Sequence, residues 1–135
     1  DKWNAEFPTW NNSTMGTHMN YAYCAKINHE PVINFPGLIK FNLDTGASEY
    51  YSEGPGYRYS EAPFAPATGA ASEDHGYVVS FVRNEAAGQS EVHIIDAQNF
   101  TQGPVCKLVL PCRVPEGFHA TWARGDMLGD RLATQ

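Results

Sequence analysis

One histidine near the C-terminal end of the chain stands in a segment suited to presenting a ligand atom at a fixed point. His119 follows Pro115, Gly117 and Phe118, and Trp122 comes three residues later. Proline fixes its own backbone and removes a donor, whereas glycine admits φ values that bulkier residues adopt only at a cost. A neutral imidazole held against apolar rings is a typical metal ligand. The same pattern suits a hydrogen-bonded core histidine, and this segment alone favours that plainer interpretation.

The remaining titratable residues give weaker chemical signals. The other histidines are His18, His29, His75 and His93. A zinc hydrolase built from His18, His29 and His119 is a weak hypothesis, because the chain has no HExxH motif or comparable ligand spacing. His93 lies between two apolar residues of an expected strand, which predicts a packed or edge histidine. The neighbours Asp74 and His75 have the composition of a catalytic dyad, but an Asp-His turn is usually solvated.

Composition and charge exclude several classes of protein. The chain has 135 residues, enough for one modest domain, and a formal charge of −6 that argues against binding to nucleic acid or an anionic membrane. It has no run of roughly 18 apolar residues of the kind that spans a membrane, and it does not open on a signal segment. The three cysteines, Cys24, Cys106 and Cys112, have no metal-type spacing. We therefore expect reduced thiols and a cytoplasmic protein.

The elements that must position these side chains are expected to be strands. The sequence is rich in aromatic residues, glycine and proline and poor in strong helix formers, which favours an all-β protein with many turns. Residues 1–18 and 53–59 are expected to be irregular. About seven short strands are expected, including 19–27, 37–43, 47–52, 77–82, 90–96 and 105–110. Consecutive hairpins of this kind suit propeller blades or a sandwich.

The hairpin at 37–52 allows its side chains to be divided between two faces. Its turn is Asp44-Thr45-Gly46, with Gly46 suited to a left-handed conformation. Alternation along the first strand places Ile39, Phe41 and Leu43 on one face. Lys40 and Asn42 are then expected on the opposite face.

Five motifs, in order along the chain, carry a resemblance to a known family. They are Glu6-Phe7-Pro8 and the ranges 60–66, 73–82, 90–97 and 114–122. In this order and spacing the chain resembles the C-terminal part of the carotenoid cleavage oxygenases, particularly the bacterial lignostilbene-cleaving branch. The resemblance covers almost the whole chain except the last dozen residues. It departs from the family pattern at Ala62, which lies between Glu61 and Pro63, and at His75, where a second aspartate is common.

The resemblance implies a seven-bladed β-propeller with one non-haem Fe(II) held on its axis by four histidines. Such enzymes use O₂ to split a conjugated carbon–carbon double bond into two carbonyl products. His119 matches the most C-terminal of the four iron ligands, and Glu61 matches the carboxylate paired with that ligand. Glu6 matches another supporting glutamate, whose histidine would precede this chain. The other four histidines match no ligand position, so three ligands would lie outside these 135 residues.

Elementary chemistry agrees with these implied roles. Neutral imidazoles suit Fe(II), and a carboxylate that accepts the other ring N–H fixes the tautomer and raises the basicity of the ligand. Glu61 lies among Ala, Pro and Phe residues, where an unpaired buried carboxylate would be costly. The alternatives are a solvent-facing Glu61 on a loop and, for Glu6, an exposed carboxylate beside a turn proline.

The implied organisation is an incomplete oxygenase domain over residues 1–123, equal to about two blades, followed by a tail over 124–135 that could form a short helix. Two blades cannot close a propeller, so we expect the chain to need the remaining N-terminal part of the same enzyme and to be inactive alone. Exposed blade edges would favour self-association, and a homodimer is open. The other partners implied are O₂ and an apolar or phenolic alkene.

Two questions of function stay open at the level of sequence. A non-catalytic propeller or sandwich could instead bind a partner through the tyrosines of 50–59. Such a module has no reason to bring Glu61 and His119 together. Within the enzyme hypothesis, the segments 61–64 and 117–122 favour phenolic stilbenes over phenylpropenoids and carotenoids.

Overall fold

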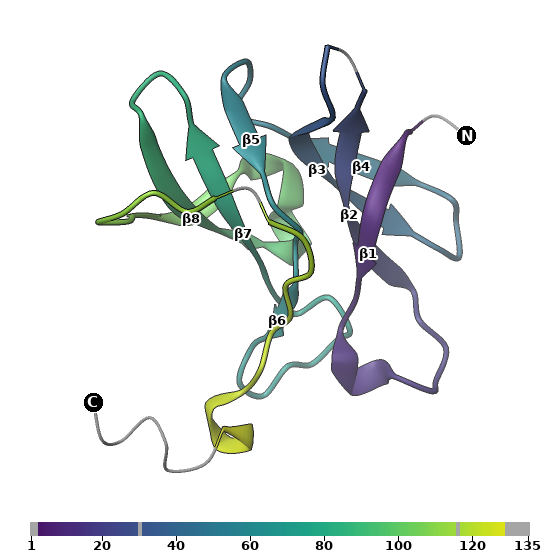
Figure 1. Ribbon diagram of the computed structural model, residues 1–135. Helices are drawn as coiled ribbons and strands as arrows, with labels where there is room; N and C mark the ends of the chain where they lie inside the picture. Colours follow the sequence, from purple (N-terminus) through teal and green to yellow (C-terminus); the bar gives the residue numbers. More distant parts are fainter. Residues whose placement is uncertain (1–2, 30, 116, 129–135) are drawn as a thin grey trace.

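Two antiparallel sheets, side by side, account for most of the chain in the computed structural model, which describes residues 3–29, 31–115 and 117–128 (Figure 1). The first sheet has the order β1 (Ala5–Thr9), β2 (Tyr21–Asn28), β3 (Asn34–Asn42), β4 (Ser48–Tyr51). The second has the order β5 (Tyr57–Tyr59), β7 (Gly76–Asn84), β8 (Gln89–Asp96), β9 (Pro104–Val109), and β6 (Phe64–Pro66) also pairs with β7. Three 3₁₀ turns complete the described elements: η1 (Asn12–Thr14), η2 (Ala97–Gln102) and η3 (Gly125–Met127). The all-β prediction, with strands joined in sequence as in propeller blades, is confirmed.

The long hairpins form where the sequence predicts them. β7 and β8 pair without interruption from Tyr77 opposite Asp96 to Asn84 opposite Gln89. Gly88 closes their turn at φ 66°, and Gly46 closes the β3–β4 turn at φ 71°. Both φ values lie in the left-handed region, which glycine occupies without steric cost.

The core lies between the two sheets and is built largely from aromatic side chains. Tyr23 of β2 stacks on Phe64 of β6, with ring centroids 5.4 Å apart and planes inclined by 11°. Phe100 of η2 packs against the same tyrosine at 6.2 Å. Leu38, Val78 and Ile95 are fully buried in this cluster. Burying rings of this size supplies much of the free energy that holds the sheets together.

The side chains of β3 alternate between two faces as expected, but Lys40 is not exposed. This side chain is buried, and its Nζ donates to Asp74 Oδ2 at 3.0 Å and to the Ala97 carbonyl at 2.7 Å. Nζ also lies 4.4 Å from the centre of the Tyr21 ring. Leu43, expected on the apolar face, is half exposed. Alternation fixes which residues share a face but not which faces are buried. Ile39 is buried on one face of β3, and Lys40, with its ion pair to Asp74, is buried on the other.

The turn at Asp74 and His75 was expected to be solvated, but this ion pair holds the Asp74 side chain in a largely buried position. Asp74 is held by Lys40, while the backbone N–H of Ala71 donates to His75 Nδ1 at 3.1 Å. Burial alone would raise the pKa of Asp74, but hydrogen bonds from Lys40 and Ser72 outweigh it and hold that pKa below its ordinary value. The turn therefore joins the sheets rather than forming a dyad.

Three strands escaped the sequence prediction. β1 lies in the segment expected to be irregular, β5 in the expected loop, and β6 spans only Phe64–Pro66. Strands of three to five residues that contain or adjoin proline give little period-two signal. In the tail, η3 forms one short turn, and residues 129–135 lie outside the described part of the chain. Among the described residues, no helix is long and apolar enough to cross a membrane.

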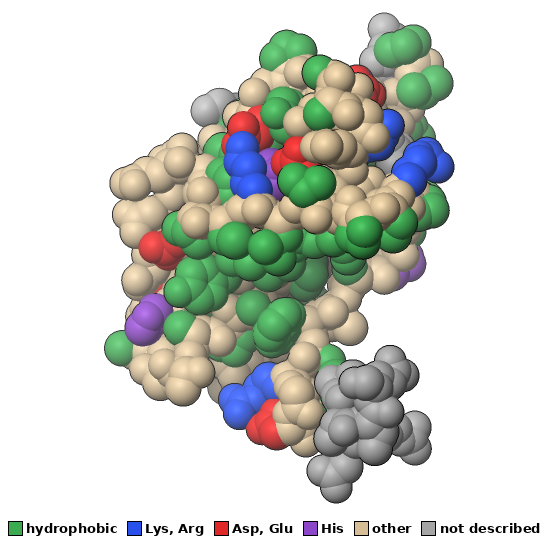
Figure 2. Space-filling model, turned by 90° about the vertical axis from the view of Figure 1, so that its left-hand side faces the viewer, with side chains coloured by type: hydrophobic (Ala, Val, Ile, Leu, Met, Phe, Trp, Pro, Cys, Tyr) green, Lys and Arg blue, Asp and Glu red, His purple; other side chains and the backbone are tan. Residues whose placement is uncertain are grey.

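The outer face of the second sheet is apolar and uncovered. Tyr77 and Phe81 of β7 and Leu108 of β9 are exposed large side chains. Figure 2 shows a broad band of hydrophobic atoms on the side of the molecule formed by this sheet. β9 pairs with β8 and is an edge strand among the described elements. This matches the expectation that a blade edge is left open.

Candidate functional site

Glu61 and His119 meet at the point where the C-terminal segment crosses between the two sheets. Glu61 is only 5% exposed, and its Oε1 and Oε2 accept the backbone N–H groups of His119 at 2.5 Å and Ala120 at 2.6 Å. The Nδ1 atom of His119 lies 3.1 Å from the same Oε1. A carboxylate this close to Nδ1 is compatible with the tautomer that carries the proton on Nδ1, in which the Nε2 lone pair is free.

Both sheets fix the position of the carboxylate. Glu61 lies between β5 and β6, and the next residue, Ala62, is fully buried. The Thr9 hydroxyl of β1 donates to the Ala62 carbonyl at 2.5 Å. On the other side, the Phe81 N–H of β7 donates to Ser60 Oγ at 3.0 Å. A buried carboxylate anchored this way and hydrogen-bonded to two N–H groups avoids the desolvation penalty of an unpaired charge.

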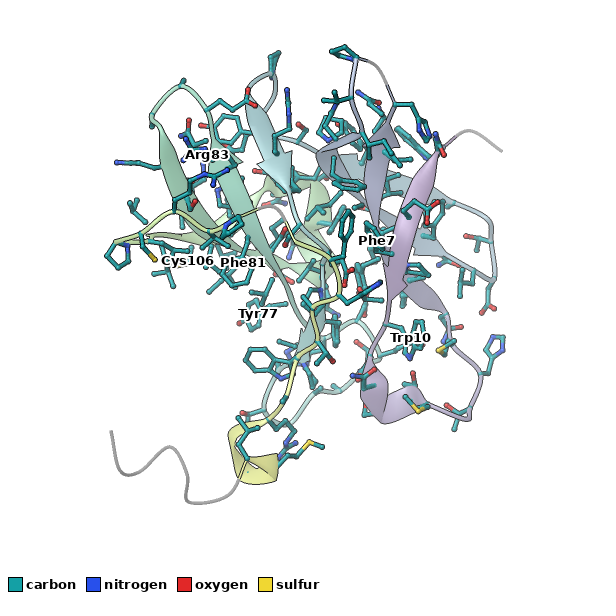
Figure 3. The ribbon with its side chains drawn as sticks, viewed as in Figure 1. Phe7, Trp10, Tyr77, Phe81, Arg83 and Cys106 are labelled. Carbon is teal, nitrogen blue, oxygen red and sulfur yellow. The ribbon has the colours of Figure 1, made fainter. Side chains whose placement is uncertain are left out.

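Two aromatic rings, those of Phe7 and Phe118, lie beside the imidazole. The Phe7 ring meets the His119 ring edge-on, with centroids 5.8 Å apart and planes at 89°. Phe7 also contacts Phe118 and Phe35, each at 5.4 Å. Figure 3 shows Phe7 between β1 and the C-terminal segment. The imidazole itself is 84% exposed, so its free Nε2 is open to a ligand from outside the described residues.

A cleft of about 190 Å³ adjoins the pair. It is lined by residues of the 114–120 segment together with Ser60, Glu61 and Phe81. A neighbouring hollow of about 160 Å³ shares Ser60, Phe81 and Phe118 and extends to Arg58 and Arg83. The surroundings of His119 are therefore apolar with one carboxylate, which suits a metal ligand beside an apolar substrate better than a solvated acid–base pair.

The other sequence candidates lie apart from this site. Glu6 is exposed on β1 opposite Ala25, and its supporting role stays a prediction. His18 pairs with Asp44 at 2.7 Å on the surface, and His29 is exposed. In the described ranges, no three His, Cys, Asp or Glu side chains come together as a metal cluster. The zinc hydrolase hypothesis therefore has no geometric support.

Sequence reasoning placed His93 in a packed position but missed its partner. His93 is fully buried, and its Nε2 lies 2.7 Å from Glu91 Oε2, while Asn84 Nδ2 donates to Glu91 Oε1 at 3.0 Å. Burial alone would raise the pKa of Glu91, but the hydrogen bonds from His93 and Asn84 hold it below its ordinary value. The sequence did contain a signal for this pair. Glu91 and His93 are two positions apart in one strand, which places their side chains on the same face.

The tyrosines proposed for a recognition surface are in part core residues. Tyr51 and Tyr59 are buried and contact each other at 6.3 Å. Burial raises the pKa of Tyr59 to about 12. This reduces the surface on which the binding-module hypothesis depended. The solvent-facing alternative for Glu61 is wrong, because that side chain is buried.

The fold and the site together define a segment of an all-β propeller that carries a histidine–carboxylate pair between two blades. The family model described as retinal pigment epithelial membrane protein matches residues 1–124. The chain therefore belongs to the carotenoid cleavage oxygenase family, to which that model applies.

Individual relatives agree with this assignment. Carotenoid 9,10(9',10')-cleavage dioxygenase 1 of Pisum sativum is 35% identical over 93% of this chain and 26% of its own length. Resveratrol cleavage oxygenase 1 of Aspergillus fumigatus is 32% identical over 72% of this chain and 19% of its own length. The lignostilbene dioxygenase of Pseudomonas brassicacearum superposes with a TM-score of 0.82 at 26% identity, over 91% of this chain and 28% of that one. The chain thus spans about a quarter of the length of such relatives.

Proposed function

We propose that the full-length protein containing this chain is a non-haem Fe(II) dioxygenase that cleaves a conjugated carbon–carbon double bond with O₂. The observation that carries the proposal is the contact between buried Glu61 and His119, which leaves Nε2 of the imidazole free. Three further histidines would come from the part of the polypeptide outside this chain. On this proposal the chain alone is inactive.

The donor chemistry of the described residues fits one ligand of such a site. A neutral imidazole with a carboxylate on its second nitrogen is a common arrangement at metal centres, because the carboxylate fixes the tautomer and orients the ring. Fe(II), when bound, supplies the chemistry that activates O₂ toward the alkene. On this proposal Glu61 would accept a hydrogen bond from the proton on Nδ1, and the rings of Phe7 and Phe118 lie beside the imidazole.

The remaining proposals concern the rest of the protein, outside Glu61 and His119. We assign residues 1–123 to the last blades of the propeller and 124–135 to a tail, with Glu6 supporting a histidine of the preceding chain. The exposed apolar face at Tyr77 and Phe81 supports a packed neighbour, which we take to be that preceding chain. A cytoplasmic location and a homodimer are also proposed.

The substrate proposed is an apolar conjugated alkene. The segments 61–64 and 117–122 favour a phenolic stilbene, and two relatives are named for resveratrol and lignostilbene. The most similar of the relatives described above is instead named for carotenoid cleavage, at 35% identity. A panel containing one stilbene and one apocarotenoid decides between them, by the ratio of kcat/KM values.

The proposal is tested by elemental analysis of the full-length enzyme purified anaerobically with Fe(II). Near-stoichiometric iron is expected in the parent, loss of iron in His119→Ala, and retention in the matched control His18→Ala, because His18 lies at the surface with Asp44. Iron unchanged by His119→Ala would overturn the assignment. A parent without iron would return the binding-module hypothesis to first place.

A further inference from the structure

Two residues of the site share an unusual backbone conformation. Among the described residues, Phe7 at φ 58° and His119 at φ 68° are the two non-glycine residues with positive φ. Each costs free energy in this region, because Cβ approaches the backbone, and such residues persist where the surroundings over-determine them. The two are not independent, since their rings are in direct contact.

A bulge in β1 produces the conformation of Phe7. Glu6 pairs with Ala25 and Thr9 pairs with Tyr23, so β1 takes three steps where β2 takes two. The extra residue turns the strand locally, and bulges commonly redirect a side chain beside a functional site. The Thr9 hydroxyl, bonded to the Ala62 carbonyl beside Glu61, fixes the end of the bulge. The bulge therefore directs the Phe7 ring toward the segment that Glu61 holds.

The carboxylate alone does not fix the plane of the imidazole. Contact between Glu61 and Nδ1 fixes one atom of the ring and leaves rotation about that contact. The Phe7 ring restricts this rotation, because it stands edge-on at 89° to the imidazole and the bulge in β1 directs it there. A metal ligand needs its lone pair aimed within roughly 10–20°.

We propose that Phe7 is a positioning residue that sets the plane of the His119 imidazole and so aims Nε2 at the metal. This inference rests on the proposed function. The competing interpretation is that Phe7 only fills space between Phe35 and Phe118. Removal of the neighbouring ring of Phe35 separates the two interpretations. If Phe7 only fills space, loss of the Phe35 ring should affect the site as loss of the Phe7 ring does. If Phe7 positions the imidazole, it should not.

The experiment uses the full-length enzyme with Phe7→Gly, Phe7→Tyr and, as a matched control, Phe35→Ala. Glycine accepts positive φ without strain, so Phe7→Gly keeps the bulge and removes the ring. Tyrosine keeps the ring. Phe35→Ala removes a ring that contacts Phe7, whereas the described rings that contact His119 are those of Phe7 and Phe118. The readouts are Fe(II) affinity by chelator competition and the visible d–d spectrum of the Co(II)-substituted protein, which reports ligand geometry.

We expect Phe7→Gly to weaken Fe(II) binding roughly three- to tenfold and to shift the Co(II) bands. Phe7→Tyr should restore both, and Phe35→Ala should leave the bands in place even if it lowers Tm. An unshifted spectrum and unchanged affinity in Phe7→Gly would overturn the inference, as would an equal shift in Phe35→Ala. A parent that binds no Fe(II) or Co(II) would instead overturn the proposed function.

Discussion

Two carboxylates in this molecule meet nitrogen atoms in opposite ways. At the junction of the sheets, Asp74 and Lys40 are both nearly buried, with side chains 13% and 6% exposed. At the candidate site, Glu61 is buried but its partner His119 is almost fully exposed. The contact between Lys40 and Asp74, called the closed contact below, is complete within the described residues. The contact between Glu61 and His119, called the open contact, leaves the Nε2 atom of the imidazole without a partner among the described residues. The structural contact and the contact proposed to present a metal ligand thus use similar groups. They differ in whether the nitrogen-bearing side chain is buried or exposed.

Backbone strain also differs between the two contacts. Both non-glycine residues with positive φ in the described ranges lie at the open contact, and neither lies at the closed one. Tight packing around Glu61 holds the strained conformations, because Thr9, Ser60 and the two N–H groups all constrain that segment. The rigid junction is therefore what allows the exposed imidazole to be held in an otherwise unfavourable conformation.

Breaking the closed contact should have the largest effect on stability. Lys40→Met leaves Asp74 as an uncompensated, nearly buried charge, and we expect the free energy of unfolding to fall by about 3–5 kcal/mol. The double variant Lys40→Met/Asp74→Asn should recover part of the loss. Urea unfolding of the full-length protein measures both. A single variant as stable as the parent would show that the ion pair does not hold the sheets together.

Altering the open contact should act on metal affinity more than on the fold. Glu61→Gln turns an amide N–H toward one of two backbone N–H donors, which loses a hydrogen bond and the preference for a proton on Nδ1. We expect about 10- to 100-fold weaker Fe(II) binding. Stability should fall by about 1–3 kcal/mol, through the unsatisfied donor. Chelator competition and thermal unfolding separate the two, and loss of stability with full metal affinity would contradict the role.

Acid should weaken the closed contact. The folded pKa of Asp74 lies below its ordinary value, because hydrogen bonds from Lys40 and Ser72 outweigh burial. The stabilisation is therefore complete above the unfolded pKa of about 4 and is lost as pH falls through the folded pKa. We expect unfolding free energy to drop below about pH 4, and less steeply in Asp74→Asn. Equal slopes in the two proteins would contradict this assignment.

The smallest effect is expected at Tyr23, where the core contains a hydroxyl that it does not use. The Tyr23 Oη is buried without a hydrogen-bond partner among the described residues, and burial raises the pKa of this phenol. Tyr23→Phe keeps the stack on Phe64 and removes the unsatisfied group. Stability should stay equal or rise by up to about 1 kcal/mol. A loss above that size, in thermal unfolding, would indicate a partner for the hydroxyl.

The sequence was informative where several signals agreed. Glycines at turns and period-two alternation located the β3–β4 and β7–β8 hairpins. The resemblance to the carotenoid cleavage oxygenases, and not a local pattern, implied that Glu61 and His119 are paired. The burial of Lys40 escaped prediction because it depends on Asp74, which lies 34 positions away in the turn between β6 and β7. β1 and its bulge escaped because a single extra residue destroys the alternation on which strand prediction depends. Long-range partners and irregular strands leave little trace in local sequence.

The separation of Glu61 and His119 along the chain has a consequence for the order of assembly. Val79 and Ile94 lie opposite each other across a short hairpin, whereas the carboxylate and its imidazole are 58 positions apart. Closing the longer loop costs more chain entropy, so hairpin pairing is expected to come first and the pair later. In a polypeptide emerging from the ribosome, Glu61 can contact His119 only after synthesis has passed His119. If His119 binds a metal, as proposed above, the contact with Glu61 that supports it therefore forms after the β7–β8 hairpin and not before it.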